Sequence, residues 1–355
     1  MNLTHFKTYS KQDILPLVKL RKFETKIGER VAVINGNGHS NGDIAEAIKQ
    51  IAAPFVVIGI PEDIGVQANY GTAGTSTAWP SFLKSFLNVQ SNDFLAGEEI
   101  AVLGHFNFSE IQNLIDQNAH DPEEKVQAYR HAVDKIDEEV EGLIKLIVSN
   151  NKIPIIIGGG HNNAYPIIKG AAKGLQQAQR IPLAQINCIN LDAHTDYRPA
   201  EGRHSGNAFR YAEDDGFLQK YCVVGIHENY LPQNVWVDLV NNPFLDCITY
   251  EDIFIHEKRT FRQAVSHAID FTNDLYSGIE LDLDCIEDIL SSAHTPSGLR
   301  TLHARQYINL CAAHAKACYL HICEGAANMS NGQSNDLTGK LISYLVTDFI
   351  KMYGA

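Results

Sequence analysis

Residues 186–196 read INCINLDAHTD, an apolar run that ends in three side chains able to bind a metal ion. The apolar part, residues 186–191, has the length and continuous hydrophobicity of a strand covered on both faces. Asp192, His194 and Asp196 follow at every second position, and on an extended backbone such side chains point the same way. Turns and helix caps also use these residue types, but three in register favour a ligand set at a strand end.

Two other stretches repeat this arrangement. Residues 153–161 read IPIIIGGGH, and residues 279–284 read IELDLD. The three glycines predict a tight turn that delivers His161 inward. This reading is preferred to a phosphate-binding loop, because the segment lacks the GxGxxG spacing and the P-loop lysine. Asp282 and Asp284 lie one strand period apart in apolar sequence, where two buried like charges are costly without cations. Since ligands bind outside the carboxyl ends of parallel strands, the three segments together predict a site for two metal ions.

Apolar runs alternate with helical patterns along most of the chain. The strand candidates are residues 55–60, 100–103, 153–157, 186–191, 222–226, 246–249, 279–284 and 317–323. The clearest helix covers residues 122–150, with Asp121 as N-cap and Pro122 at the first helical position. Further helices are expected at residues 260–275, 302–316 and 336–352. This alternation predicts an α/β protein with a doubly wound parallel sheet and right-handed crossovers.

The N-terminal 50 residues are less regular than the rest. NGNG at residues 35–38, and Asn41 with Gly42, indicate turns. No Pro/Gly/Ser linker divides the chain, so we expect an N-terminal appendage of residues 1–50 on a single main domain of residues 51–355.

Composition excludes several classes of protein. The 355 residues are 45% hydrophobic and carry a net charge of -13, which argues against a nucleic-acid or anionic membrane partner. No run approaches the roughly 18 apolar residues of a membrane span, and the N-terminus lacks a secretory apolar region, so a cytoplasmic protein is expected. The 7 cysteines are scattered without CxxC spacing and are expected to be reduced and buried.

Three further residues are candidates for the site, and two of them, Glu324 and His204, have two readings each. Glu324 ends the last strand candidate, where it would pair with a cationic substrate group or cap a helix. His204, in the segment HSGNAF, would shuttle a proton or be an ordinary loop histidine. Glu280 continues the every-second-residue series of Asp282 and Asp284 and would support the ligands.

In order and placement, the motifs across residues 153–325 resemble the ureohydrolase superfamily, which includes arginase, agmatinase, guanidinobutyrase and formimidoylglutamase. Residues 59–74, with Asp63 and Gly65, are similar to an early strand-loop of that family. The resemblance implies a three-layer α/β/α fold with a mainly parallel eight-stranded sheet, and two Mn²⁺ ions per subunit. It implies one ion held by His161, Asp192, Asp196 and Asp282, and the other by Asp192, His194, Asp282 and Asp284. A ligand set without thiolate also favours manganese over zinc.

Within this superfamily the motifs are most similar to formimidoylglutamase. Gly-Gly-Gly-His161 and the Asp196-Tyr-Arg198 run match that family, whereas Phe209 replaces an arginase-type histidine. Asn207 is a candidate substrate contact, although it stands where that family tends to have threonine, as Asn162 stands where it tends to have glutamate. Arg198 is suited to a substrate carboxylate because its guanidinium can bind one through two hydrogen bonds; the alternative is a structural pair with Glu201.

The resemblance therefore implies hydrolysis of a C–N bond in a linear amidine, namely N-formimidoyl-L-glutamate to L-glutamate and formamide in histidine breakdown. Asp196 would orient the attacking water and relay its proton, Glu324 would pair with the cationic amidine, and His204 would assist proton transfer. The alternatives are a guanidino hydrolase that releases urea, a non-catalytic metal-binding homologue, or a zinc deacetylase on a similar fold. We expect a cytoplasmic homo-oligomer that acts on a small molecule and binds neither nucleic acid nor membrane.

Overall fold

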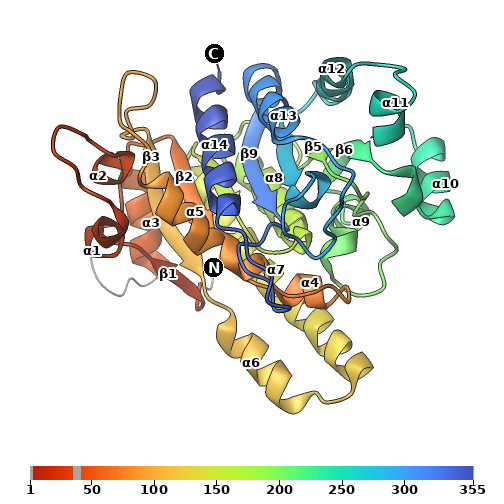
Figure 1. The fold of residues 1–355 in the computed structure, drawn as a ribbon, viewed down its shortest axis with the longest axis horizontal. Helices are drawn as coiled ribbons and strands as arrows, with labels where there is room; N and C mark the ends of the chain where they lie inside the picture. The colour runs from red at the N-terminus through yellow and green to blue at the C-terminus, as the bar shows by residue number, and fades with distance from the viewer. Residues whose placement is uncertain (1–2, 35–40, 355) are drawn as a thin grey trace.

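The computed structural model describes residues 3–34 and 41–354, and its centre is one large sheet (Figure 1). In these residues the strands are β1 (Phe6–Thr8), β2 (Phe55–Gly59), β3 (Ile100–Phe106), β4 (Ile153–Ile157), β5 (Ile186–Leu191), β6 (Leu218–Ile226), β7 (Leu245–Thr249), β8 (Ser277–Asp282) and β9 (Ala317–Cys323). The strand order is β1-β3-β2-β4-β9-β8-β5-β6-β7. Only β1 is antiparallel to its neighbour among the paired strands described; β2 to β9 run parallel.

The eight strands expected from sequence are all present, and the parallel sheet is confirmed. The expected number of eight was one too low, because β1 pairs with β3 at the edge of the sheet. With 3 residues, β1 is too short to show a periodic pattern in the sequence.

Helices cover both faces of the sheet. They are α1 (Lys11–Ile14), α2 (Ile27–Arg30), α3 (Asn41–Gln50), α4 (Ile64–Gln67), α5 (Ala78–Phe86), α6 (Ser109–Asn118), α7 (Pro122–Ser149), α8 (Ala164–Gln177), α9 (Ala208–Asp214), α10 (Gln233–Asn241), α11 (Tyr250–Phe254), α12 (Phe261–Phe271), α13 (Thr301–His314) and α14 (Leu337–Met352). Short 3₁₀ segments are η1 (Leu15–Leu17), η2 (Thr75–Thr77), η3 (His161–Asn163), η4 (Ser205–Asn207), η5 (Glu228–Tyr230) and η6 (Leu283–Cys285).

The three-layer arrangement follows from the alternation of side chains along each strand. In β2, Val57 packs into the core that contains residues of α5, α12, α13 and α14. Its neighbours Val56 and Ile58 point to the opposite face, into the core that contains residues of α7, α8 and α9. Figure 1 shows α5 and α14 beside each other on one face of the sheet, consistent with their close packing. The α/β/α architecture is therefore confirmed.

The four helices predicted from sequence are present within a few residues of their expected bounds, whereas α8, which is longer than α12, was not predicted. The Asp121 carboxylate accepts hydrogen bonds from the backbone N–H groups of Glu123 and Glu124, which confirms it as the N-cap of α7. No helix among the described residues is both long enough and apolar enough to cross a membrane. None of the cysteines forms a disulfide, and all except the partly exposed Cys247 are buried, as expected.

The N-terminal residues pack on the edge of the sheet that carries β3. Ile14 and Ile27 are fully buried in the same core as α5. The predicted turns at residues 35–38 lie outside the described residues, and residues 41–42 begin α3 instead of forming a turn. The proposed boundary at residue 50 stays a prediction.

Candidate metal centre

The metal-ligand candidates and Glu324 converge at the carboxyl ends of four neighbouring strands, β4, β9, β8 and β5, in the middle of the sheet. His161 follows the glycine turn after β4, and Asp192 directly follows β5. Asp282 is the last residue of β8, and Glu324 directly follows β9. The sheet thus brings together residues up to 163 positions apart along the chain, at the edge where parallel sheets bind ligands.

The turn that presents His161 depends on glycine and on a buried carboxylate. Gly158 and Gly159 adopt φ values of 88° and 76°, which confirms the need for glycine after β4. The Glu62 carboxylate accepts hydrogen bonds from Gly160 N at 3.0 Å and from Asn163 Nδ2 at 2.7 Å. Sequence reasoning missed Glu62, which fixes the turn from a different loop.

One ligand set is centred on His161. Its Nδ1 atom lies 2.7 Å from an Asp196 oxygen, 3.1 Å from an Asp282 oxygen and 3.3 Å from an Asp192 oxygen. The His161 and Asp192 side chains are fully inaccessible to solvent. Three carboxylates around a single imidazole nitrogen form a group that could hold a metal ion.

A second set shares Asp192 with the first. His194 Nδ1 lies 3.1 Å from Asp284 Oδ2 and 3.7 Å from Asp192 Oδ1, whereas Asp192 Oδ2 faces His161. Asp192 therefore lies between the two histidines, and its role as a ligand shared by two ions stays a prediction. Asp282 lies in the first set only, and its Oδ1 accepts a hydrogen bond from Asp284 N at 2.8 Å. A bridging role for Asp282 stays a prediction.

The electrostatics of the cluster fit divalent cations. Burial, with the charges of Asp284 and Asp192, raises the pKa of Asp282 well above its usual value. Burial and Asp192 raise the pKa of Asp196 to about 6. One Asp284 oxygen is buried and has no hydrogen-bond partner among the described residues. Cations stabilise such crowded carboxylates in their ionised form, so the residues present fit two metal ions.

Two residues of the site have unusual backbone conformations. Asp196 has a φ of 46° and Glu324 a φ of 60°, in the left-handed region that favours glycine. Such conformations cost on the order of 1–3 kcal/mol each and concentrate at functional sites. The surrounding bonds hold Glu324 in place, because its Oε1 accepts the backbone N–H of His161 at 2.9 Å.

A cavity of about 630 Å³ opens above the ligand sets. Its walls include Asp196, Arg198, Asp284, Glu324 and Tyr230. Tyr230, which sequence reasoning missed, stacks on the His194 ring with centroids 5.0 Å apart. Burial and Asp284 raise the pKa of Glu324 to about 8.

Arg198 lies on the cavity wall and also pairs within the protein. Its guanidinium donates to Asn69 Oδ1 and to Glu201 Oε1, both at 2.7 Å. The structure therefore contains the Glu201 pair of the structural alternative, yet 40% of the Arg198 side chain remains exposed. Its position is compatible with a substrate contact as well.

His204 and Asn207 do not line the cavity. His204 is buried, its Nδ1 accepts the Gly206 N–H at 3.1 Å, and burial together with Arg198 lowers its pKa to about 3. Asn207 accepts from Arg203 and His204 N through Oδ1 and donates to Gly202 O at 2.8 Å. The geometry supports a role for both in holding the loop, rather than the proton shuttle and substrate contact expected from sequence.

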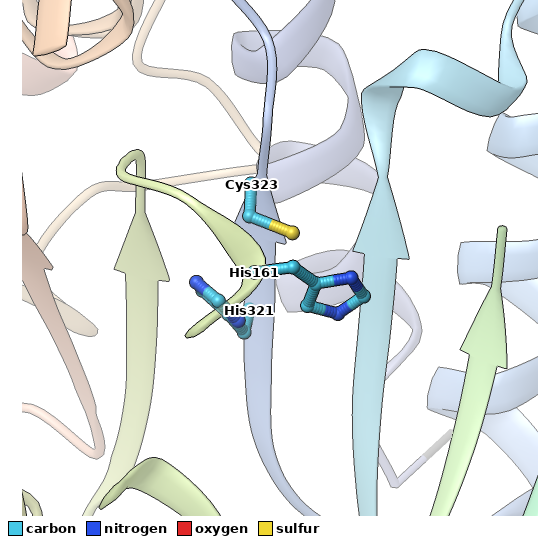
Figure 2. Close-up of side chains that lie close together, drawn as sticks. All are labelled: His161, His321 and Cys323. Carbon is cyan, nitrogen blue, oxygen red and sulfur yellow. The ribbon is translucent and has the colours of Figure 1, made fainter. Parts of the chain in front are cut away.

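A further cluster of His161, His321 and Cys323 lies beside the centre (Figure 2). In this view the two imidazole rings extend to opposite sides of β9. His321 Nδ1 is engaged with Glu280 Oε2 at 2.6 Å, and burial raises the pKa of the Cys323 thiol well above its usual value. This cluster therefore supplies support rather than a thiolate ligand.

Comparisons with known proteins agree with this architecture. The model of the arginase family matches residues 53–348. Formimidoylglutamases of Streptococcus pyogenes, from serotypes M6 and M49, are each 26% identical over 237 residues. Each alignment covers 65% of this chain and 64% of the relative, so the chain matches less than two thirds of these relatives' length.

Solved structures with the same fold cover nearly the whole chain. Formimidoylglutamase from Bacillus subtilis has a TM-score of 0.68 at 18% identity, covering 96% of this chain and 98% of that one. Trypanosoma cruzi formiminoglutamase with Mn²⁺ has a TM-score of 0.65 at 18% identity, covering 92% and 97%. Because the family model spans most of the sequence, and the fold agrees, this chain belongs to the arginase family.

Proposed function

We propose that this protein is a binuclear manganese hydrolase that cleaves a C–N bond of a linear amidine, with N-formimidoyl-L-glutamate as the substrate. The observation that carries the proposal is the pair of overlapping ligand sets, around His161 and around His194, at the floor of one cavity. The formimidoylglutamase names of the relatives support the substrate. The cytoplasmic location, the homo-oligomeric state and the role in histidine breakdown stay predictions.

Each of the two ligand sets would hold one ion. His161, Asp196 and Asp282 would bind the first ion, His194 and Asp284 the second, and Asp192 both. Carboxylate and imidazole donors without thiolate favour Mn²⁺ over softer metals. When bound, a pair of such ions activates water as a nucleophile at neutral pH and stabilises the charge that develops on the substrate.

The protein's own side chains would complete the reaction. The Glu324 carboxylate lines the cavity and would pair with the cationic amidine, which stabilises the ionised form of a group that burial otherwise keeps protonated. Water adds its oxygen to the amidine carbon, and the bond from that carbon to the glutamate nitrogen breaks. Asp196 would accept a proton from the attacking water and deliver it to that nitrogen, so that glutamate leaves as an amine. The hydroxyl on the carbon then loses its proton to this amine, which gives neutral formamide and the ammonium form of glutamate.

Arg198 would bind a carboxylate of the substrate. Its guanidinium reaches the cavity wall but already donates to Asn69 and Glu201, so the substrate would share this cation with Glu201. A charge-assisted contact of this kind selects a dicarboxylate amidine over an uncharged one.

The experiment is a product assay on a panel of substrates. Metal-free protein is loaded with Mn²⁺ and incubated separately with formimidoylglutamate, arginine, agmatine and 4-guanidinobutyrate, with Asp284→Ala purified in parallel as the control for contaminating activity. We expect equimolar formamide and glutamate from formimidoylglutamate alone. Urea from a guanidino substrate without formamide would overturn the substrate assignment, and no product from any substrate would overturn the hydrolase.

A further inference from the structure

A row of polar side chains lies one strand period below the ligands. Asn190 and Glu280 precede Asp192 and Asp282 by two positions, on β5 and β8, and His321 precedes Glu324 by three, on β9. The sheet register pairs Asn190 with Glu280 and Glu280 with His321, so the three are neighbours across the sheet. All are fully buried. Burying a polar group costs free energy unless that group is hydrogen-bonded, so the partners of these three side chains show what the row does.

Glu280 is the centre of this row. Its Oε1 accepts the Tyr319 hydroxyl at 2.7 Å, and its Oε2 contacts His321 Nδ1 at 2.6 Å. The same Oε2 lies 3.4 Å from Nε2 of His161. Two short hydrogen-bond contacts, with Tyr319 and His321, therefore hold the Glu280 carboxylate beside Nε2 of the His161 ring.

The two nitrogens of His161 face different partners. Nδ1 faces the carboxylates of Asp192, Asp196 and Asp282, and Nε2 faces Glu280. A histidine that binds a metal through Nδ1 must carry its proton on Nε2. Nε2 is buried and makes no well-oriented hydrogen bond among the described residues. The Glu280 carboxylate is therefore the group in position to accept a hydrogen bond from it. Partners of this kind orient ligating histidines and raise their basicity.

We propose that Glu280 is a positioning residue for His161. Glu280 accepts a hydrogen bond from the Nε2–H group, which fixes the tautomer that leaves Nδ1 free for the metal. Tyr319 and His321 hold the Glu280 carboxylate in place. Asn190 plays the parallel part for Asp192, since its Nδ2 donates to Asp192 Oδ2 at 2.9 Å. This inference rests on the proposed metal centre and adds to it a layer of supporting residues.

The alternative is that Glu280 only stabilises the fold as the partner of His321. The two readings differ in which metal ion feels the loss of Glu280. Positioning through His161 affects the ion in the His161 set, whereas a general loss of stability affects both sets alike. The test therefore measures Mn²⁺ affinity in variants that retain one set each.

The experiment combines Glu280→Gln with Asp284→Ala, which disables the His194 set, and separately with His161→Ala, which disables the His161 set. Mn²⁺ dissociation constants are measured by competition with a fluorescent chelator. In the Asp284→Ala background we expect Glu280→Gln to weaken binding by about 10–100-fold, the usual range for such supporting partners. In the His161→Ala background we expect a change of less than about twofold, because the contacts of the Glu280 side chain are to Tyr319, His321 and His161 and not to His194 or Asp284.

Glu139→Gln is the matched control. Glu139 is a buried carboxylate that contacts His5 Nδ1 at 2.6 Å, so its removal also breaks a Glu–His contact but leaves the centre untouched. We expect it to leave both Mn²⁺ affinities unchanged. If Glu280→Gln does not fold, Tyr319→Phe removes one bond to Glu280 and should give a smaller loss in the Asp284→Ala background only.

Equal weakening in both backgrounds, or no weakening in either, would overturn the positioning role. These results are distinct from a failure of the proposed function. If the unmodified protein binds no Mn²⁺, the metal centre itself is refuted, whereas normal binding with an indifferent Glu280→Gln refutes this inference alone.

Discussion

Replacing Arg198 by alanine separates a substrate contact from a structural one. The change removes two hydrogen bonds of 2.7 Å, to Asn69 and to Glu201, from a side chain that is 40% exposed. An exposed ion pair contributes only about 0–1 kcal/mol to folding, so the free energy of unfolding should fall by at most about 1 kcal/mol. A charge-assisted contact with substrate contributes about 1.5–3 kcal/mol, so kcat/KM for formimidoylglutamate should fall roughly tenfold to a hundredfold.

The assay compares two substrates and one control variant. Formamide release is measured with formimidoylglutamate and with an N-alkyl formamidine that lacks carboxylates, and urea denaturation gives the stability of each protein. Glu201→Gln breaks the same ion pair while Arg198 remains, so it should match the small stability loss and retain discrimination between the substrates. Equal losses of kcat/KM for both substrates in Arg198→Ala, with a stability loss well above 1 kcal/mol, would refute the substrate role.

Three further predictions test other parts of the account. Asp284→Ala should fold, since a small side chain fits where the carboxylate was, but should lose most turnover even in excess Mn²⁺; unchanged turnover would exclude Asp284 as a ligand. Burial lowers the pKa of His105 to about 4, so the folded state binds fewer protons than the unfolded state between about pH 4 and 6.5. Stability should therefore rise with pH across that window and less steeply in His105→Gln, as thermal melts at matched pH would show; identical slopes would contradict the shift. Glu62→Gln places an amide N–H against one of the two backbone N–H groups that Glu62 accepts, of Gly65 and Gly160, so it should lower both the melting temperature and Mn²⁺ affinity, and an unchanged affinity would show that the turn is fixed by other contacts.

The ligands themselves were predictable because each lies at the end of an apolar run. A strand fixes both the side of the sheet and the end at which the next polar residue emerges, so Asp192 and Asp282 follow from local pattern alone. The extended backbone expected for His194, Asp196 and Asp284 was wrong, because β5 ends at Leu191 and β8 at Asp282; Asp196 is left-handed and Asp284 lies in η6. The same reasoning found the glycine turn before His161. The alternation of apolar strands with amphipathic helices is also a local pattern, and it predicted the sheet with helices on both faces.

The residues that surround the ligands were not predictable in this way. Glu62 acts on Asn163 from 101 positions away, and Tyr230 reaches His194 from another loop. The Asn207 side chain could hydrogen-bond a substrate, but it makes its hydrogen bonds within its own loop, and only the tertiary structure shows this. A strand of 3 residues such as β1 has no periodicity to read.

The most direct test of the central claim is the number of Mn²⁺ ions that the metal-free protein binds tightly, counted by titration and by elemental analysis after desalting. The account predicts two ions per chain in the unmodified protein. It predicts one ion in His161→Ala and one in Asp284→Ala, because each change disables a different ligand set. A single ion in the unmodified protein, or two ions retained in either variant, would contradict two ligand sets that share Asp192.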